Sequence, residues 1–468
     1  MDHIKHLRAM GYTEAEHLMS GHVERWWSWY TASNDWYSSV ERSSDGRTTY
    51  KVDRLTIRPA KLVCQEWASL IMNERVEVSA EDDAASEWLK AWALASRFTA
   101  TGQRLVERAF ALGTGAWVLS PRRVKQSRTG RTVADAAADI AVKRFDARQI
   151  VPLSYDDDEC ADCAFVSEVV VSGKRYGQIQ IHELDGGTYH IRTRCFDEKG
   201  RMVVLPGVLE DIDTETDVPT FALVRPGIEN QYLDYAPVGV SIFDDAIGAV
   251  KLTDTAIDNM WRDVWLGQKM VFLSERMLDH DEYGNVTVPR AQDQQLFRLA
   301  ETDTGEKMVE EYNPDLRASD NKLVVGTGLA LLGSRCGLGN DYFSLEGASG
   351  VAAAKTATEV ISEDSDLFRN VRKHSNAIVP AVQRIAAGAL ALARTIQGAD
   401  VPDDPGAITV TLDDSVIEDR AAKKKADLAD VASGIMPPWE YRAKWYGEEE
   451  AAAKRMVAEA QGLLAPEL

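Results

Sequence analysis

The sequence lacks the motifs that place reactive groups for catalysis. It has no Gly-rich phosphate loop followed by Lys and Ser or Thr, no His-Glu-x-x-His and no nucleophile elbow. Gly337 and Gly339 form too short a pattern for a dinucleotide-binding fingerprint, and no convergent cluster of titratable residues can be recognised. We therefore expect a protein that is not an enzyme and that uses no cofactor.

Cysteine is scarce as well. The five cysteines are odd in number and unevenly spaced, which argues against a disulfide framework and favours synthesis in a reducing cytoplasm. Cys160 and Cys163 have a spacing seen in zinc sites, but two further ligands would be needed, and only Cys195, His182 and His190 lie near in the sequence. We interpret the cysteines as ordinary free thiols and predict no metal site there.

Two local charge clusters allow alternative interpretations. The acidic residues at 156–159 could bind a divalent ion, although carboxylates in loops are usually just hydrated. Residues 121–150 hold eight basic side chains against three acidic ones. Because one local excess of charge is weak evidence for nucleic acid, we interpret this segment as a solvated loop or a contact between subunits.

Long hydrophobic runs are also missing. A membrane helix needs about 20 uncharged apolar residues, and the nearest run, residues 386–392, is far shorter. The first 17 residues carry charge throughout and lack the apolar core of a signal peptide. We expect neither a membrane contact nor export.

Basic residues are outnumbered, 53 against 74 acidic ones, for a formal net charge of −21. This charge opposes tight binding to DNA, because such binding depends on Lys and Arg neutralising phosphates. The acidity is consistent with two interpretations. It keeps the protein soluble, or it allows the protein to handle DNA without holding it.

The rest of the composition is that of a folded protein, with 45% hydrophobic and 27% charged residues. The first 120 residues or so are rich in tryptophan, and the spacing of apolar residues predicts a helix over 58–74 with Pro59 in its first turn. From about 115 to 235, β-branched runs separated by Gly-containing turns predict strands and hairpins at 139–142, 164–171, 176–182 and 188–194. The sequence therefore predicts a mainly helical α+β fold.

Long helices are predicted in the second half. A heptad seam, broken by one acidic residue, predicts a helix over 242–266; its positions are Phe243, Ile247, Val250, Asp254, Ile257, Trp261 and Val264. Further helices are expected over 317–333 and from a capping box at Thr356 and Glu359 to about 397, with a bend at Pro380. A strand at 407–412 and a charged helical tail follow.

In this order of segments, the chain resembles the portal proteins of tailed bacteriophages, in particular those with long, non-contractile tails. The resemblance covers roughly residues 25–460. The segments that carry it are Trp27-Ser-Trp-Tyr, Arg58-x-x-Lys61, Ala68-Ser-Leu-Ile-Met-Asn-Glu74, Pro237-x-Gly-x-Ser-Ile-Phe243, Pro314-x-x-Arg317, Gly337-Leu-Gly-x-x-Tyr-Phe-Ser344 and Asp413-Asp-Ser415. The most specific segment is Thr356-Ala-Thr-Glu-Val-Ile-Ser-Glu-Asp-Ser365, followed by Arg369 and His374.

The resemblance implies an elongated portal fold. Its expected parts are a wing over 1–240, a first stem helix over 241–268, a clip over 269–316, a second stem helix over 317–336, a tunnel loop over 337–355, a long bent wing helix over 356–400, and a strand followed by a helical crown over 401–468.

The resemblance also implies a function. Copies of the chain would form a homo-oligomeric ring, of twelve subunits in the family, at one capsid vertex of a virion made in the bacterial cytoplasm. Double-stranded DNA would pass through the ring without sequence preference during packaging and ejection. The implied partners are the terminase packaging motor, a head-completion or tail adaptor protein, and the major capsid and scaffolding proteins. Another virion structural or adaptor protein is the alternative.

An acidic channel wall would repel phosphate and let DNA slide. The channel-lining candidates are Asp254 and Asp258 in the first stem helix and Asp341, Tyr342, Phe343 and Glu346 in the tunnel loop. Asp254 could instead face an arginine of a neighbouring subunit, and the two loop aromatics could equally be anchors tucked against the stem. The candidates for docking the motor and the adaptor at the clip are Asp281, Glu282, Tyr283 and Asn285.

Overall fold

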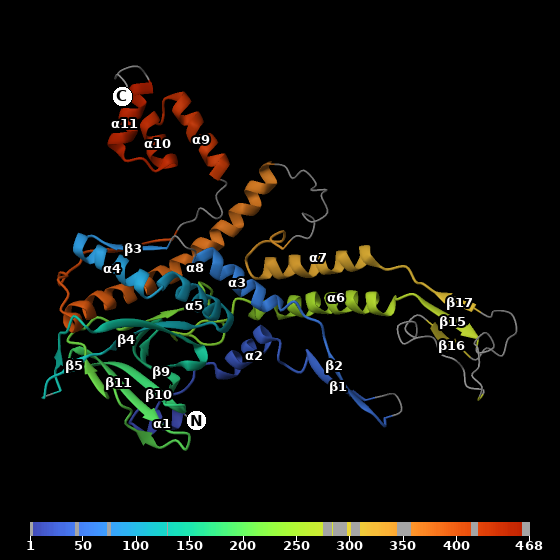
Figure 1. Cartoon of the computed structure of the whole chain (residues 1–468), viewed down its shortest axis with the longest axis horizontal. Helices are drawn as coiled ribbons and strands as arrows, with labels where there is room; N and C mark the ends of the chain where they lie inside the picture. The colour runs from blue at the N-terminus through green and yellow to red at the C-terminus, as the bar shows by residue number, and fades with distance from the viewer. Residues whose placement is uncertain are drawn as a thin grey trace. The chain divides into compact units, whose positions relative to one another are not determined.

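The computed structural model describes residues 3–42, 46–72, 76–128, 130–274, 283, 297–300, 309–343, 357–412 and 420–460. The chain divides into two compact units, Met1–Val410 and Thr411–Leu468. Helices and sheets alternate through the first unit, as expected for an α+β fold (Figure 1).

The helices of the first unit include those that the apolar spacing predicts. In α3, Val63, Trp67 and Ile71 are buried along one face, and Pro59 occupies the first turn. The helical bounds are α1 (His3–Ala9), α2 (Ser20–Thr31), α3 (Pro59–Ile71), α4 (Asp83–Ala95), α5 (Phe98–Leu112), α6 (Ile247–Leu266), α7 (Ala318–Arg335) and α8 (Ala357–Leu392). Helices are therefore confirmed at each of the predicted helical segments of this unit.

The predicted strands form the larger sheet. Its order is β12-β11-β10-β9-β8, with β13 beside β11. The bounds are β8 (Ile150–Asp156), β9 (Glu159–Val171), β10 (Lys174–Asp185), β11 (Thr188–Phe196), β12 (Met202–Val203) and β13 (Asp211–Asp213). Ser172 and Gly173 both have positive φ, 50° and 78°, which matches the right-handed twist of the β9–β10 hairpin.

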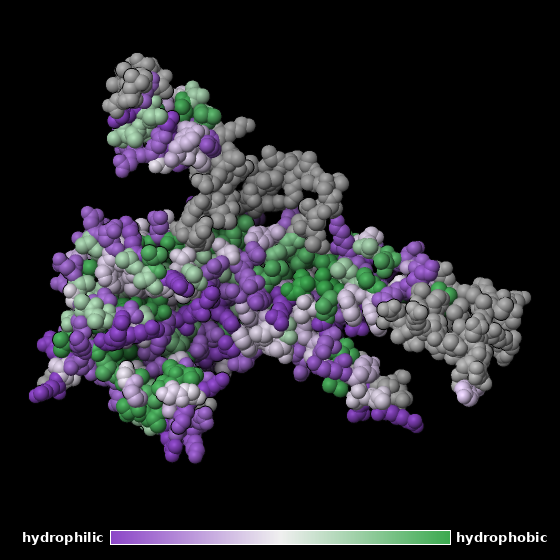
Figure 2. All heavy atoms as spheres, viewed as in Figure 1, coloured by the Kyte–Doolittle hydropathy of each residue, from purple (hydrophilic) through white to green (hydrophobic). Residues whose placement is uncertain are grey.

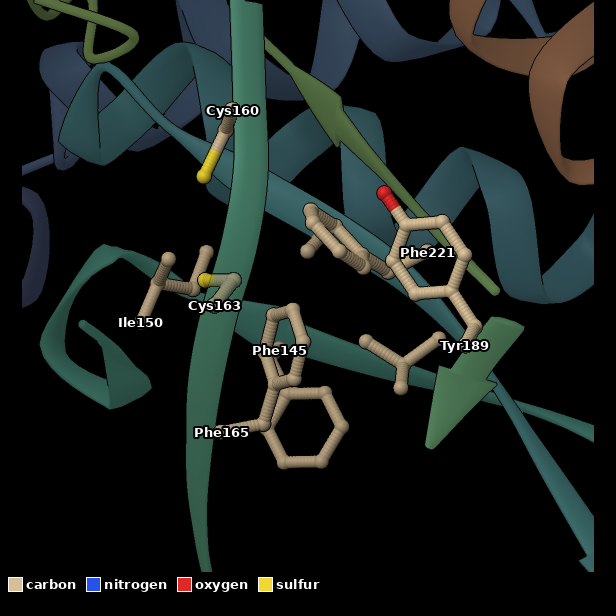
Figure 3. Packing of buried hydrophobic residues seen from close by; sticks show 9 residues of the cluster. Phe145, Ile150, Cys160, Cys163, Phe165, Tyr189 and Phe221 are labelled. Carbon is tan, nitrogen blue, oxygen red and sulfur yellow. The ribbon is translucent and has the colours of Figure 1, made fainter. Parts of the chain in front are cut away.

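A second sheet, ordered β14-β4-β7, packs against the first. Its strands are β4 (Gly115–Arg122), β7 (Asp139–Asp146) and β14 (Phe221–Val224). Phe145, Phe165 and Phe221, one from each of β7, β9 and β14, meet in the core between the sheets (Figure 3). Apolar residues on alternate positions of β10, Ile179 and Ile181, face a separate cluster that includes Leu7 of α1. Both faces of the larger sheet are therefore covered.

Helix α8 runs across the second sheet. It packs against β14 and β4 and touches α3 and α4. The helical stretch Asp366–Gln397 is long and apolar enough to cross a membrane by length and composition, but 56% of its most apolar window is buried inside the subunit. This burial is typical of a core helix. Pro380 lies inside α8, and the bend expected there stays a prediction.

Short strand pairs complete the first unit. They are β1 (Ser38–Arg42) with β2 (Thr49–Asp53), β5 (Lys125–Gln126) with β6 (Thr132–Val133), β3 (Glu77–Ala80) with β18 (Ile408–Thr411), and the three-stranded order β16-β15-β17. The last three are β15 (Met270–Ser274), β16 (Phe297–Ala300) and β17 (Val309–Tyr312). The N-terminal region expected to be helical thus also contains strands.

The predicted strand at 407–412 is present as β18 and pairs with β3. This strand was expected in the same part of the chain as the helical tail, residues 401–468. In the structure, the first unit ends at Val410 and the second begins at Thr411. The second unit contains α9 (Arg420–Ser433), α10 (Pro438–Tyr446) and α11 (Glu450–Ala460). Within it, Asp427 of α9 accepts a hydrogen bond from Trp445 Nε1 at 2.8 Å.

Candidate functional site

Helices α6 and α7 lie side by side, and β15, β16 and β17 lie beyond their ends (Figure 1). Gly328 allows close approach, because a Cβ at this position would lie 2.8 Å from Thr253 Oγ1 and 3.0 Å from Thr253 Cα. Val325 and Leu329 of α7 pack against Ala256 of α6. The two helices therefore form one packed pair.

A polar contact joins the same pair near the strands. Asp263 of α6 accepts hydrogen bonds from Arg317, which precedes α7, and from Asn321 Nδ2 at 2.8 Å. The Arg317 and Asn321 donors hold the pKa of Asp263 below its usual range. The contact ties the start of α7 to the last turns of α6.

Asp254 faces the interior of the subunit. Its side chain is fully buried and accepts hydrogen bonds from Tyr37 Oη at 2.7 Å, Thr56 Oγ1 at 2.7 Å and the Ile57 backbone N at 3.0 Å. Burial raises the pKa of this carboxyl, while the three donors oppose the shift. The carboxylate clamps the segment after β2 onto α6.

Asp258, one turn later, has the same role. It is 5% exposed and accepts hydrogen bonds from the Leu55 backbone N at 3.0 Å and from Arg262 Nε at 2.9 Å. A carboxylate enclosed in this way cannot present its charge to DNA on a channel wall. Both carboxylates are engaged within the subunit, which argues against a channel-lining role for Asp254 and Asp258 and against an arginine of another subunit as the partner of Asp254.

The second half of the α6 seam is uncovered in the subunit. Trp261 is 49% exposed, Val264 56% and Trp265 57%, whereas the earlier seam residue Val250 is fully buried. The rings of Trp261 and Trp265 stack with centroids 6.1 Å apart. Leu323, Val324 and Leu331 of α7 are also exposed. Hydrophobic residues are visible over this helix pair in Figure 2. Exposed apolar surface of this kind is typical of a protein–protein interface.

The residues after α7 are attached to the body. Trp67 Nε1 donates to the Cys336 carbonyl at 2.9 Å, and Asn370 Nδ2 of α8 donates to the Gly337 carbonyl at 2.8 Å. Tyr342 Oη donates to Glu66 of α3 at 2.9 Å. Phe343 packs against the cluster between α6 and α7. The structure thus fits the anchor alternative for Tyr342 and Phe343, and Asp341 beside them is exposed.

Several other predicted residues fall outside the described part of the chain. These are Asp281, Glu282 and Asn285 of the expected clip, Glu346 of the loop and Thr356 of the helix cap. Tyr283 is described and is 89% exposed. Glu359 lies within α8, but its side chain is outside the described residues. Their assigned roles stay predictions.

His374 of α8 connects three segments. Its Nδ1 accepts a hydrogen bond from the Gly227 backbone N at 3.0 Å, and its ring meets Trp67 edge-on at 4.5 Å. Burial lowers its pKa to about 3, so the imidazole is neutral. The motif that contains His374 was recognised in the sequence. The contact of His374 with the loop before α6 could not be predicted from that motif.

Sequence reasoning missed Asp244 at the start of α6. This carboxylate is 8% exposed and accepts hydrogen bonds from Trp26 Nε1 at 2.6 Å and Tyr232 Oη at 2.5 Å. Tyr232 lies 12 residues before Asp244, but Trp26 lies 218 residues away, so no local pattern could have identified the contact between α2 and Asp244. Asp244 positions the first turn of α6 against α2.

The cysteines and the acidic turn form no metal site in the part of the chain that the structure describes, where no group of three possible ligands comes together. Cys160 and Cys163 lie in the hydrophobic core, and Cys163 is next to Ile150 (Figure 3). Cys163 Sγ donates to the Val151 carbonyl at 3.5 Å, and burial raises the pKa of this thiol. Asp158 of the acidic turn pairs with Arg225.

Comparison with known families gives one match. The sequence matches the family described as phage portal protein, SPP1 Gp6-like, over residues 17–327. A search of the curated proteins gave no match. The matched region contains the two β-sheets that share the aromatic core, all of α6 and the first half of α7. Portal proteins of this family are structural components of the virion, where they form a capsid-associated ring. This chain belongs to the SPP1 Gp6-like family of phage portal proteins.

Proposed function

We propose that copies of this chain close into a ring, with twelve subunits as the expected number, and that double-stranded DNA passes through its axial channel. The observation that carries this proposal is the uncovered apolar surface on the second half of α6, where Trp261 and Trp265 are about half exposed. A head-to-tail ring needs two different complementary faces on each subunit. The exposed residues of α6 provide one apolar face, and Leu323 and Val324 of α7 provide a second.

In this proposal α6 and α7 are the stem helices, and the body built on the two sheets belongs to the wing. The stem surface that remains uncovered in the subunit is buried against the next copy. The second unit, α9 to α11, corresponds to the crown. Asp341 and Glu346 remain the proposed channel-facing charges, because Asp254 and Asp258 are enclosed.

The ring is tested by mass photometry and negative-stain imaging of the purified full-length chain. We expect closed particles of about a dozen copies with an axial hole. Overexpressed rings with a neighbouring subunit number would still support the proposal, because the contact that closes them is the same. Monomers or dimers alone, across salt and protein concentration, would contradict it.

We further propose that the region between α6 and α7 is the clip, which docks the terminase motor during packaging and a tail adaptor later. The support is its position beyond both helices, together with the strands β15, β16 and β17. Deleting residues 281–285 should leave the ring intact and abolish adaptor binding in a pull-down assay. Unchanged adaptor binding would place the docking surface elsewhere.

A further inference from the structure

A positively charged cleft lies between α5 and the two sheets of the body. Its volume is about 530 Å³. The residues that line it include Arg104 of α5, Trp117 of β4, Lys143 and Arg144 of β7, Glu168 of β9 and Gln178 of β10. None of the roles assigned above uses these side chains.

The arginines around the cleft have no carboxylate partner. In the described part of the chain, neither Arg104 nor Arg144 forms an ion pair, and neither does Arg108, one turn further along α5. Burial and the neighbouring arginines lower the pKa of Arg144. Glu168 at the edge is paired with Arg175, with an N–O distance of 3.7 Å. The cleft therefore holds an excess of positive charge.

Hydrogen-bond donors around the cleft are unsatisfied as well. Trp117 is 1% exposed, and its indole Nε1 has no acceptor. Arg108, which is outside the lining of the cleft, packs over the Trp27 ring at 4.5 Å, and its buried Nη1 also has no acceptor. A buried donor without a partner costs about 1–3 kcal/mol. Cations and unsatisfied donors together form a site for a group that brings negative charge and acceptor oxygens.

We propose that the cleft receives the acidic turn between β8 and β9 of a neighbouring copy of this chain, an inference that rests on the proposed ring. In that turn, Asp156, Asp157 and Glu159 are exposed and form no ion pair in the described part of the chain. Asp157 is at the tip, with φ of 52°. The turn offers the carboxylates that the cleft lacks.

The turn cannot reach the cleft of its own subunit. Glu159 begins β9, whereas the cleft is lined by Ser167, Glu168 and Val169 further along the same strand. Eight to ten residues of extended strand span about 30 Å. A contact between one end of β9 and the other end of a neighbour's β9 is head-to-tail, which is the kind of contact that closes a ring.

The observations favour a protein ligand over DNA. The cleft of about 530 Å³ has room for a few side chains, whereas a DNA backbone is usually followed by an extended basic track. The net charge of −21 also repels DNA and other copies of the chain alike. An attractive pair at the subunit interface would offset the repulsion between copies.

The test reverses charge on each side and then on both. We would measure ring assembly of the full-length chain by mass photometry at 50 mM and 500 mM salt. The cleft variant is Arg104→Glu with Arg144→Glu, and the turn variant is Asp156→Lys with Asp157→Lys. Each variant should raise the protein concentration needed for half-assembly at least tenfold at low salt. The variant that carries all four substitutions should assemble at a concentration close to that of the unmodified chain.

A matched control reverses two exposed basic residues elsewhere, Lys90→Glu with Lys199→Glu, and should assemble as the unmodified chain does. Near-UV circular dichroism of each variant monitors folding. Unchanged assembly of the cleft variant, with intact rings of the unmodified chain, would overturn this inference and leave the proposed ring standing. Absence of rings in the unmodified chain would instead refute the ring itself.

Two further outcomes would overturn the assignment of the ligand. If the cleft variant weakens assembly but the four-fold variant does not recover, another acidic segment occupies the cleft. If the cleft variant assembles normally and loses affinity for a 20-base-pair duplex in a fluorescence anisotropy assay at 50 mM salt, the cleft contacts DNA.

Discussion

The carboxylate of Asp254 and the phenol of Tyr37 are joined by a buried hydrogen bond of 2.7 Å between residues 217 positions apart. Through this contact, α6 is fixed to the segment that follows α2. Asp254, the one acidic residue in the apolar seam of α6, therefore holds two parts of the subunit together. Its charge is therefore not available at the surface of the subunit.

Replacing Asp254 by Ala should destabilise the first unit strongly. The change leaves the Tyr37 hydroxyl, the Thr56 hydroxyl and the Ile57 backbone N without their acceptor. The free energy of unfolding should fall by about 3 kcal/mol or more. Tyr37→Phe removes one donor together with its bond and should cost about 1 kcal/mol. Thermal unfolding measures both, with the exposed Asp234→Ala as the control. A midpoint unchanged by Asp254→Ala would contradict the clamp.

Gly239 should not tolerate a side chain. A Cβ there would lie 2.6 Å from the Gly113 carbonyl oxygen, where the loop before α6 crosses the end of α5. Gly239→Ala should lower the free energy of unfolding by about 2 kcal/mol. Gly248→Ala is the control, since nothing lies within 4 Å of a Cβ at that position, and in a helix it should be neutral or stabilising by up to about 1 kcal/mol. Equal changes in stability from Gly239→Ala and Gly248→Ala would contradict the close contact between Gly239 and the Gly113 carbonyl.

Stability should fall as the pH is lowered from 6.5 towards 3. Burial lowers the pKa of His182 and of His374 to about 3, while in the unfolded chain each is near 6.5 and takes up a proton first. Each histidine should therefore cost about 2 kcal/mol of stability between pH 7 and pH 5. His374→Asn keeps an acceptor for the Gly227 N–H and removes one titration. Its thermal midpoint should depend less on pH, and an unchanged pH dependence would refute this.

Trp261→Ser with Trp265→Ser should weaken ring assembly and leave the subunit folded. Both rings are about half exposed in the subunit, and large aromatic side chains often dominate the binding energy of an interface. Mass photometry should show a shift from rings to smaller species. Leu94→Ser on α4 removes a side chain that is 82% exposed and should not affect assembly. Normal rings from the double variant would exclude this part of α6 from the interface.

Reversing the charge of the loop after α7 should retain DNA in the channel. Asp341→Lys with Glu346→Lys adds phosphate contacts, so translocation should slow at low salt and recover at high salt. Asp217→Lys with Asp234→Lys, at two exposed residues outside the loop, is the control with the same change in net charge. Packaging by the double variant at the unmodified rate at low salt would show that these residues do not face the DNA.

Local pattern accounts for much of the fold. The alternation in β9, β10 and β11, the helical spacing in α3 and the long seam of α6 are visible in the sequence, because side chains repeat with the period of each element. Short elements were missed in the N-terminal region. The hairpin β1–β2 lies between tryptophan-rich helices and was not distinguished from them, although Asp45-Gly46 between its strands is a sequence typical of a hairpin turn.

Periodicity identifies the face of a helix on which a residue lies, but not what that face meets. Asp254 was placed correctly on the seam of α6, yet its burial depends on Tyr37 and Thr56, about 200 residues earlier. In the same way, Tyr342 follows a Gly-rich segment typical of a projecting loop, and its hydroxyl nevertheless reaches Glu66 of α3. Contacts of this kind form only when the chain folds back on itself.

The sequence by itself determined the class of protein, because the order of its segments and its acidity are properties of the chain and need no contacts to be read. Tertiary structure alone decided which charges are exposed. Arg104, Arg144 and Glu168 come from separate elements and line one cleft only because α5 packs beside β7 and the two sheets pack together. Burial and pairing depend on distances between segments remote in sequence, and those distances are set by the packing of the whole core.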